Sequence, residues 1–408
     1  MSKRPSYPLD LSALAYPMMR SRRTQSNFRF SARLIDEVDP SLLERSLAEV
    51  LLAYPNLKTR IVPSFFWHKL VRNDAPLLVK EDDRPPLTPF CKKDTNGYPF
   101  RLAYRENEIV LEIFHAATDG DVGALFMTDL LNCYCALKEG CEPPSVNRKL
   151  TVGDAFLVHA KKKSFRKISL HRYNGTSAVA LGERGNYLPS PTLLSCDLPI
   201  SELKAAARSW DATLTEYVAA CYITAIAETQ PLPLTKPLCL FLPVNLRRFF
   251  PSDTLQNFVC FERITLPRGE SDLSFARVLS IVHAEFMRNV TRENMQEHVD
   301  DVRRTLTLPL VKYFPLFLKK PLFKFFRMLL NKVRQTAILS NVGTLSLSPE
   351  AERRVKDLRF FLNIGKNAPL NVAVLSYGGS CRVSLTCGLK ETDVPARFFE
   401  LLRTQGKK

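Results

Sequence analysis

Strand-like and helix-like segments interleave along both halves of the sequence, and this mixture constrains the fold more than any other feature. Residues 28–35 alternate apolar and polar side chains over most of their length, as a strand does. Asp39 and Pro40 then form a helix start, and apolar residues follow at one-face helical spacing. Residues 101–105 and 108–114 have the pattern of a hairpin. The sequence therefore predicts an α/β fold.

The second half continues the mixture without repeating the sequence of the first. A chain of 408 residues exceeds what one hydrophobic core usually supports, so we expect two domains, 1–165 and 191–408, joined by a connection at 166–190. Helices are expected at 201–209, 213–228, about 272–298 and about 393–403, and strands at 192–198, 237–244, 257–266, 336–341, 357–363, 370–376 and 381–387.

The net charge of +17 favours an anionic partner, which can be nucleic acid, acidic lipid or a phosphorylated cofactor. No zinc finger, recognition helix or base-stacking motif is present in the sequence, so we expect no nucleic-acid binding. The basic run at 161–167 fits either the phosphates of a cofactor or, as the composition favours, the solvated face of a linker.

The cysteines and histidines give no metal-binding pattern. Ten cysteines lie between Cys91 and Cys387 without a C-x-x-C pair, which is typical of buried free thiols in a reducing compartment.

The N-terminal residues lack a continuous apolar run, so we expect no signal peptide, no transmembrane segment and a cytoplasmic location.

One histidine stands where a strand ends and a helix begins, in His115-Ala-Ala-Thr-Asp119-Gly120. A side chain at this position can face a cavity, and histidine titrates near neutral pH, as a general base must. Asp119 can fix the turn or pair with a cation, and Gly120 leaves room for close approach. Taken alone, the motif favours the plainer interpretation, a structural histidine with Asp119 as a helix N-cap.

Further segments change that balance. They are Asp39-Pro-Ser-Leu-Leu, Tyr54-Pro-Asn-Leu-Lys-Thr-Arg60, Pro243-Val-Asn-Leu-Arg-Arg-Phe-Phe-Pro-Ser252 with Asn257-Phe258, Ser340-Asn-Val-Gly343, and 369–387. In this order, with H-x-x-x-D-G, they resemble the CoA-dependent acyltransferase superfamily. That group includes chloramphenicol acetyltransferase, peptide-synthetase condensation domains and bacterial alcohol acetyltransferases, and the details are most similar to the last.

The resemblance implies two chloramphenicol-acetyltransferase-like α/β sandwich domains with a solvent tunnel between them. His115 would deprotonate an acceptor, which then attacks a thioester directly. Asp119 would be structural, beside Gly120 and turned toward a cation, for which Arg60 is the first candidate and Lys58 the second. The resemblance also places these residues at the tunnel: Asn245, Arg247, Asn257, Ser340, Asn341 and Gly343.

Acyl-CoA is the expected donor, used as a co-substrate, and no tightly bound cofactor or metal is expected. An alcohol, or an amine, is the expected acceptor. Phe114 replaces the first histidine of the condensation-domain motif, and no D-F-G-W-G segment of the plant enzymes occurs. Two alternatives remain: a condensation-type synthase using carrier-bound donors, and a non-catalytic protein of the same fold that binds an acyl carrier or acylated ligand.

A basic, phenylalanine-rich segment occupies residues 308–330, within a stretch from Val302 to Pro349 that has nine basic residues and no acidic one. Short helices broken by prolines can lie on an anionic membrane through such a surface. The composition also fits an ordinary packed segment with solvated lysines, which we favour.

Overall fold

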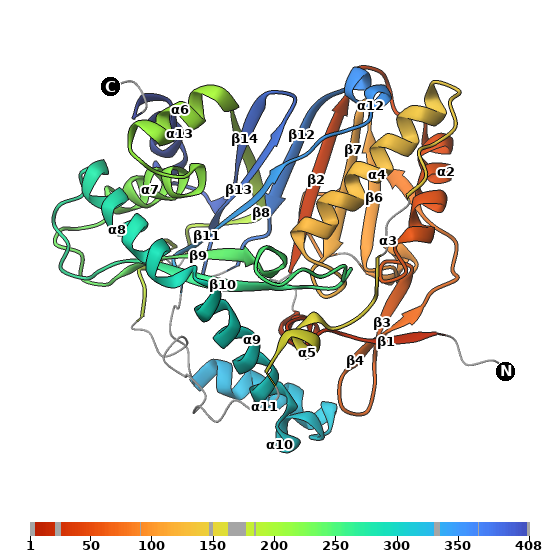
Figure 1. Cartoon of the computed structure of the whole chain (residues 1–408), viewed down its shortest axis with the longest axis horizontal. Helices are drawn as coiled ribbons and strands as arrows, with labels where there is room; N and C mark the ends of the chain where they lie inside the picture. Colours follow the sequence, from red (N-terminus) through yellow and green to blue (C-terminus); the bar gives the residue numbers. More distant parts are fainter. Residues whose placement is uncertain are drawn as a thin grey trace.

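The computed structural model describes residues 5–20, 26–89, 91–146, 150–161, 177–182, 185–329, 335–365 and 367–405. The basic run beyond Lys161, and half of the connection expected at 166–190, lie outside the described residues. Helices and sheets alternate in layers, as the sequence predicts (Figure 1).

The first sheet is built mainly from the N-terminal half. In spatial order its strands are β12 (Val355–Leu362), β2 (Asn27–Leu34), β7 (Glu108–Phe114), β6 (Phe100–Arg105) and β5 (Val79–Glu81). β12 runs antiparallel to β2 although it lies more than three hundred residues later. The expected division into 1–165 and 191–408 leaves out this exchange, because pairing between distant strands has no local sequence signal.

Two helices cover this sheet, α2 (Pro40–Val50) and α4 (Gly120–Lys138). Asp39 caps α2 by accepting the backbone N–H groups of Ser41 and Leu42, as predicted. The apolar stripe of α2 and most of α4 are buried against the sheet in one core. Since α4 begins directly after the turn that follows β7, this packing fixes the position of the His115 motif.

The second sheet is built from the C-terminal half. Its strands are β10 (Val259–Leu266), β9 (Leu238–Asn245), β11 (Ala337–Thr344), β13 (Leu370–Tyr377), β14 (Ser380–Leu389) and β8 (Tyr187–Pro199). Helices α6 (Ile200–Ser209), α7 (Leu214–Ala227), α8 (Phe275–Asn289) and α13 (Val394–Thr404) complete its core.

The long helix expected at 272–298 is two helices. α8 ends at Asn289, and α9 (Arg292–Thr307) starts a new direction. The break occurs because the Thr291 side chain caps α9 by accepting the N–H of Asn294. The sequence interpretation missed this cap.

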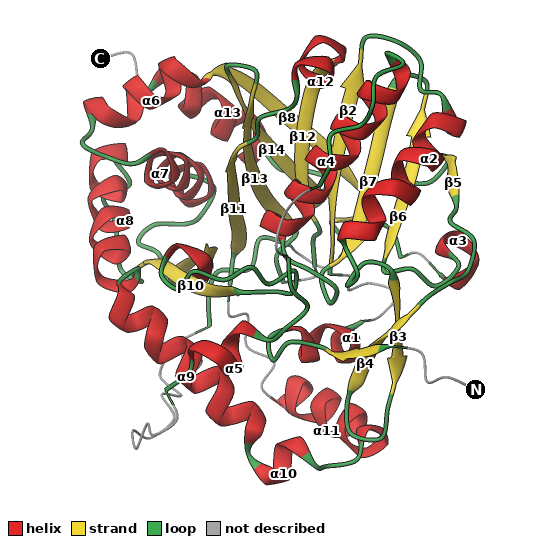
Figure 2. Ribbon diagram, turned by 45° about the vertical axis from the view of Figure 1, so that its right-hand side comes forward, coloured by secondary structure: helices red, strands yellow, loops and turns green. Residues whose placement is uncertain are grey.

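A third layer lies at the lower side of both sheets in Figures 1 and 2. Its small sheet has the order β1 (Ser6–Pro8), β4 (His68–Arg72), β3 (Thr59–Pro63). The short helices α1 (Tyr16–Met19) and α5 (Ala155–His159) pack there with α9, α10 (Pro309–Lys312) and α11 (Leu316–Leu329). The remaining helices are α3 (Lys92–Thr95), α12 (Pro349–Arg354) and the 3₁₀ turns Ala13–Ala15, Leu51–Ala53 and Leu246–Arg248.

All ten cysteines are free thiols, and Cys91 and Cys141 are exposed whereas the other eight are buried. Among the described residues, no group of histidine, cysteine or acidic side chains is arranged to hold a metal ion. Within the same residues, no helix is both long enough and apolar enough to cross a bilayer.

Candidate functional site

His115 lies in the turn between β7 and α4, and aromatic rings hold its side chain. Its backbone N–H donates to the carbonyl of Ser26 at 2.7 Å. The Tyr16 ring stacks on the imidazole with centroids 4.8 Å apart, and the Phe28 ring meets it edge-on at 5.3 Å. The imidazole is half-buried, and these ring contacts restrict its orientation.

Asn257 fixes the proton position on the imidazole. His115 Nδ1 and Asn257 Oδ1 are 2.7 Å apart. The Asn257 amide nitrogen points the other way and donates to Asp10 Oδ2 at 3.1 Å, so the side-chain oxygen must face the histidine. An amide oxygen only accepts, hence Nδ1 carries the proton and Nε2 is the basic nitrogen.

Asp10 anchors Asn257 from the N-terminal segment. It is fully buried and also accepts the Asn257 backbone N–H, the Ser12 hydroxyl and the N–H of Ala13. Burial raises the pKa of Asp10, and these donors counteract the effect by stabilising the charged form. The carboxylate therefore acts as the fixed end of a chain of hydrogen bonds that ends at His115.

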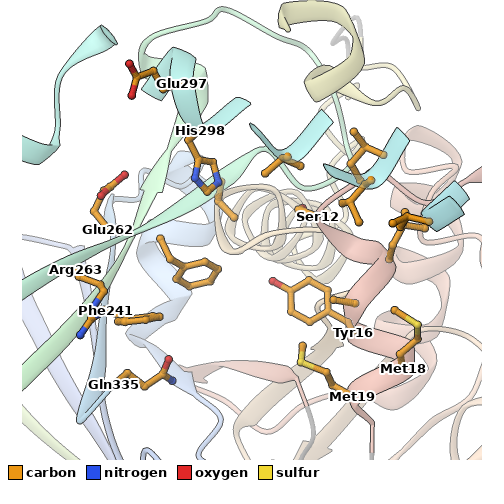
Figure 3. A pocket seen from close by; sticks show the side chains of 18 of the residues that line it. Ser12, Tyr16, Met18, Met19, Phe241, Glu262, Arg263, Glu297, His298 and Gln335 are labelled. Atoms are coloured by element: carbon orange, nitrogen blue, oxygen red, sulfur yellow. The ribbon is translucent and has the colours of Figure 1, made fainter. Parts of the chain in front are cut away.

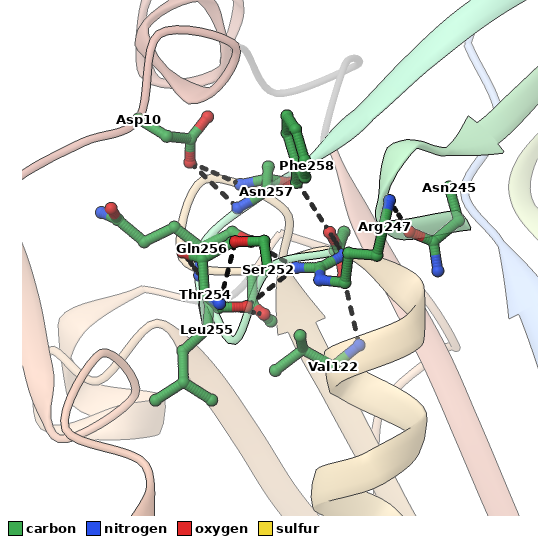
Figure 4. A network of polar contacts seen from close by, with 12 residues as sticks. Asp10, Val122, Asn245, Arg247, Ser252, Thr254, Leu255, Gln256, Asn257 and Phe258 are labelled. Carbon is green, nitrogen blue, oxygen red and sulfur yellow. Dashed lines mark hydrogen bonds and ion pairs between the residues drawn. The ribbon is translucent and has the colours of Figure 1, made fainter. Parts of the chain in front are cut away.

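Asp119 caps a helix and pairs with a cation, but the cation is not the one expected. One carboxylate oxygen caps α4 through the N–H of Val122. The other accepts from Arg247 Nη1 at 2.7 Å and from the N–H of Phe258 at 2.9 Å (Figure 4). The prediction of Arg60, or secondarily Lys58, as the partner of Asp119 was wrong.

The physical reason is the course of the chain. Arg60 lies on β3, which pairs with β4 in the small sheet. Arg60 lies beside Gly97 instead. A Cβ placed on that glycine would be 3.8 Å from the Cβ of Arg60. Sequence spacing cannot show that the 3₁₀ turn after β9, which carries Arg247, reaches the start of α4.

Arg247 also holds the segment that carries Asn257. Its Nη2 donates to the carbonyls of Thr254 and Gln256 at 2.9 and 2.8 Å. Thr118, inside the histidine motif, donates to the carbonyl of Leu255 at 2.7 Å. Segment 254–258 is thus bonded to the His115 turn from both sides, and the Asp119–Arg247 pair supports the His115–Asn257 contact indirectly.

Of the remaining residues expected at the tunnel, Asn245 lies beside Arg247, whereas Ser340, Asn341 and Gly343 lie on β11. Asn245 is near the site: it accepts the N–H of Arg247 at 2.9 Å and hydrogen-bonds to Asp121. Burial, together with the Asp119 charge, raises the pKa of Asp121 to about 6.

Ser340 and Asn341 pair in register with β13, and the irregular end of β11, which contains Gly343, begins after Asn341. The Asn341 side chain accepts the N–H of Gly343 and donates to Thr215 on α7, so its contacts are structural. Gly343 has a φ of +81°, which explains the glycine. This segment meets the motif through Val342, which lies 3.5 Å from the position of a Cβ on Gly120.

A cavity of about 1350 Å³ is lined by both halves of the chain, and it reaches Tyr16 but not His115 itself. Tyr16 joins the two, because its ring stacks on His115 and also lines the cavity. Tyr16 and Phe241 face the same space from opposite sides in Figure 3. The rest of the wall comes mainly from α1, β10 and helices α8 to α11 and is largely apolar.

Sequence reasoning missed Asp10 and Tyr16. Both lie in an N-terminal segment that carries no motif. The one available signal was a carboxylate among apolar residues that are themselves buried, such as Leu9 and Leu11.

Comparison with known proteins identifies structures that share the fold of this chain. No family model and no curated protein sequence matches the chain. Solved structures do match over nearly the whole length, which shows the fold.

Polyketide synthase associated protein 5 from Mycobacterium tuberculosis is 14% identical with a TM-score of 0.65, covering 100% of this chain and 98% of that one. The first condensation domain of the calcium-dependent antibiotic synthetase, in complex with a substrate analogue, is 16% identical with a TM-score of 0.66, covering 98% and 96%. The starter condensation domain of rhizomide synthetase, in complex with C8-CoA and Leu-SNAC, is 14% identical with a TM-score of 0.62, covering 98% and 94%. The chain therefore has the fold of these condensation domains and of the polyketide synthase associated protein.

Proposed function

We propose that this protein transfers an acyl group from acyl-CoA to an alcohol or amine, with His115 as the general base. The observation that carries the proposal is the hydrogen bond between His115 Nδ1 and Asn257 Oδ1. In the neutral ring it makes Nε2 the nitrogen with the free lone pair, which is what a general base needs. A structural histidine would not require its tautomer to be fixed by a relay to a buried carboxylate.

The chemistry needs no acyl-enzyme. His115 Nε2 takes the proton of the acceptor hydroxyl or amine as the acceptor attacks the thioester carbonyl. The new C–O or C–N bond forms, the C–S bond breaks, and the proton passes to the departing thiolate, which gives free CoA. Asn257 stabilises the transient imidazolium because its oxygen accepts from Nδ1 more strongly when the ring is charged.

The donor assignment rests on two supports. The rhizomide starter domain, which has the same fold, was solved with C8-CoA. The chain's charge of +17 suits a phosphorylated co-substrate. The alcohol acceptor, and with it an O-acetyltransferase-like activity, rests on the resemblance of the sequence motifs alone.

A screen of thioesters and acceptors tests the proposal. The purified full chain is given acetyl-, octanoyl- or palmitoyl-CoA with alcohols or amines, and free thiol is measured while products are identified by mass spectrometry. Acceptor-dependent thiol release with a matching ester or amide supports it. Turnover only with donors on an acyl-carrier protein would favour the condensation-type alternative, and binding without turnover would favour the non-catalytic one.

A further inference from the structure

Two segments that are distant in sequence meet at the lower end of the molecule. The tip of the β3–β4 hairpin packs on α10 and α11, since the N–H of Leu316 donates to the carbonyl of Phe65 at 2.8 Å. The Phe66 and Tyr313 rings meet edge-on at 5.6 Å. Both figures of the whole chain show the hairpin tip beside these helices (Figures 1 and 2).

This junction exposes large apolar side chains. Phe65, Leu310 and Phe317 keep 65%, 78% and 68% of their surface in solvent. Of the fourteen exposed large hydrophobic residues in the described parts of the chain, seven lie here, which is far denser than scattered surface residues. We call them the tip surface: Phe65, Leu308, Leu310, Tyr313, Phe317, Leu318 and Leu322.

The two segments that form the tip surface carry charge of one sign. Residues 59–73 and 302–349 contain no acidic residue. Lys312 and Lys320 are exposed there. Lys319 points inward: its Nζ lies 3.4 Å from the centre of the Trp67 ring and donates to the carbonyl of Phe66. These segments are basic and apolar and contain no acidic residue, which is the composition of interfacial membrane-binding segments.

The tip surface also borders the cavity. Leu310 and Leu322 belong to both, and Trp67, Val311 and Phe314 continue the wall inward. The cavity extends from these residues to Tyr16, which stacks on His115. An apolar chain that enters beside α10 therefore has a largely apolar route toward the proposed base.

We propose that the tip surface docks on anionic lipid bilayers and admits a long-chain lipid, as acyl donor or acceptor, into the cavity. The substrate part of this inference rests on the proposed acyltransferase function, whereas the docking part does not. A bilayer fits better than a protein partner, because the exposed apolar side chains of α10, α11 and the hairpin tip come with basic residues and without acidic ones in the two segments that carry them.

Vesicle co-sedimentation tests the docking. The full chain is incubated with vesicles of phosphatidylcholine, or of equal parts phosphatidylcholine and phosphatidylglycerol, at low and high salt. It should sediment with the anionic vesicles at low salt and be released at high salt, because screening weakens the attraction. A protein that stays in the supernatant at low salt contradicts the proposal.

Matched variants separate the tip surface from general basicity. Lys312→Gln and Lys320→Gln should each weaken vesicle binding about fivefold, the worth of one basic residue near an anionic surface. Phe65→Ser and Phe317→Ser should each weaken it by roughly tenfold through lost apolar insertion. Lys204→Gln on α6 and Leu52→Ser, whose side chain is 70% exposed, are controls and should bind like the parent. Equal losses in controls and tip variants would contradict a localised surface.

The outcomes distinguish this inference from the proposed function. Normal transfer of acetyl groups in solution with no vesicle binding contradicts the docking proposal and supports the acyltransferase function. Vesicle binding without any acyl transfer supports the docking proposal and contradicts the acyltransferase function. If an acidic acyl-carrier protein binds through Lys312 and Lys320 while anionic vesicles do not, the face is a protein interface and the membrane proposal is wrong.

Discussion

His115 Nδ1 and Asn257 Oδ1 lie 2.7 Å apart although 142 positions separate the two residues in the sequence. The histidine follows a strand of the first sheet, and the asparagine precedes a strand of the second. The contact therefore exists only when both halves are folded and docked. Asp10, from the N-terminal segment, completes the chain of hydrogen bonds.

Replacing Asn257 with alanine should lower turnover by about one to two orders of magnitude, less than loss of the base itself. Without the acceptor, His115 can adopt either tautomer and its protonated form is less stabilised. We expect kcat to fall with the KM for the donor nearly unchanged. An unchanged kcat in a folded variant would show that the contact has no part in the reaction.

The Asp119–Arg247 pair should matter for stability. Asp119→Ala leaves a largely buried guanidinium unpaired and also removes the cap of α4, so unfolding should become easier by on the order of three to five kcal/mol. Denaturant unfolding measures this. A double-mutant cycle with Arg247→Ala should show coupling, because the residues are in contact.

Arg60→Ala is the matched control for this pair. The structure places Arg60 away from Asp119, so a cycle with Asp119→Ala should be additive. Coupling between Arg60 and Asp119 as strong as that with Arg247 would mean that the sequence-based assignment was right.

Local patterns in the sequence predict much of the secondary structure correctly. The Asp39 cap, the hairpin of β6 and β7, and the strands β9 to β14 all lie within a few residues of the predicted positions, because alternation and capping act over short distances. Partners across the structure were harder. Nothing near Asp119 in the sequence identifies Arg247, and nothing near β2 identifies β12.

The candidate site shows the same division. His115, Asp119 and the neighbourhood of Arg247 and Asn257 came from motifs, whereas their mutual contacts required the structure. Asp10 and Tyr16 belong to no motif and depend wholly on how the N-terminal segment packs.

Four charged side chains of the first sheet form a buried cluster: Arg29, Asp82, Arg101 and Glu112. Glu112→Ala would leave two buried arginines with one carboxylate, and should destabilise the fold by roughly three to five kcal/mol. Arg45→Ala, which breaks an exposed pair with Glu49, should change stability by about 0.5 kcal/mol or less. Equal effects on the unfolding midpoint would contradict the role of burial.

The same cluster predicts acid sensitivity. Burial acts to raise the pKa of Asp82, but Arg29 and Arg101 outweigh it and hold that pKa below its ordinary value. The unfolded chain therefore binds a proton first, so the stabilisation is present above the ordinary carboxyl pKa and is lost as the pH falls through the lower folded value. Unfolding curves at acidic pH should show this loss, and Asp82→Asn should reduce it.

Asp154 should act in the opposite direction. Burial, with the nearby Asp10 charge, raises the pKa of Asp154 to about 7. The folded chain then holds a proton that the unfolded chain has released, so stability should fall as the pH rises from the ordinary carboxyl range to about 7 and level off above it. Asp154→Asn should flatten this part of the curve of stability against pH. If the variant keeps the slope of the parent, the pH dependence comes from another group.

The most direct measurement compares turnover in the parent protein and His115→Ala with acyl-CoA and an acceptor, read as thiol release and product formation. His283→Ala is the matched control, since His283 is half-exposed and pairs with Glu216 on α7. We expect His115→Ala to melt like the parent and to lose about two to four orders of magnitude in kcat, the usual contribution of a positioned base, while the control keeps normal turnover. Near-normal turnover in a folded His115→Ala would contradict the account.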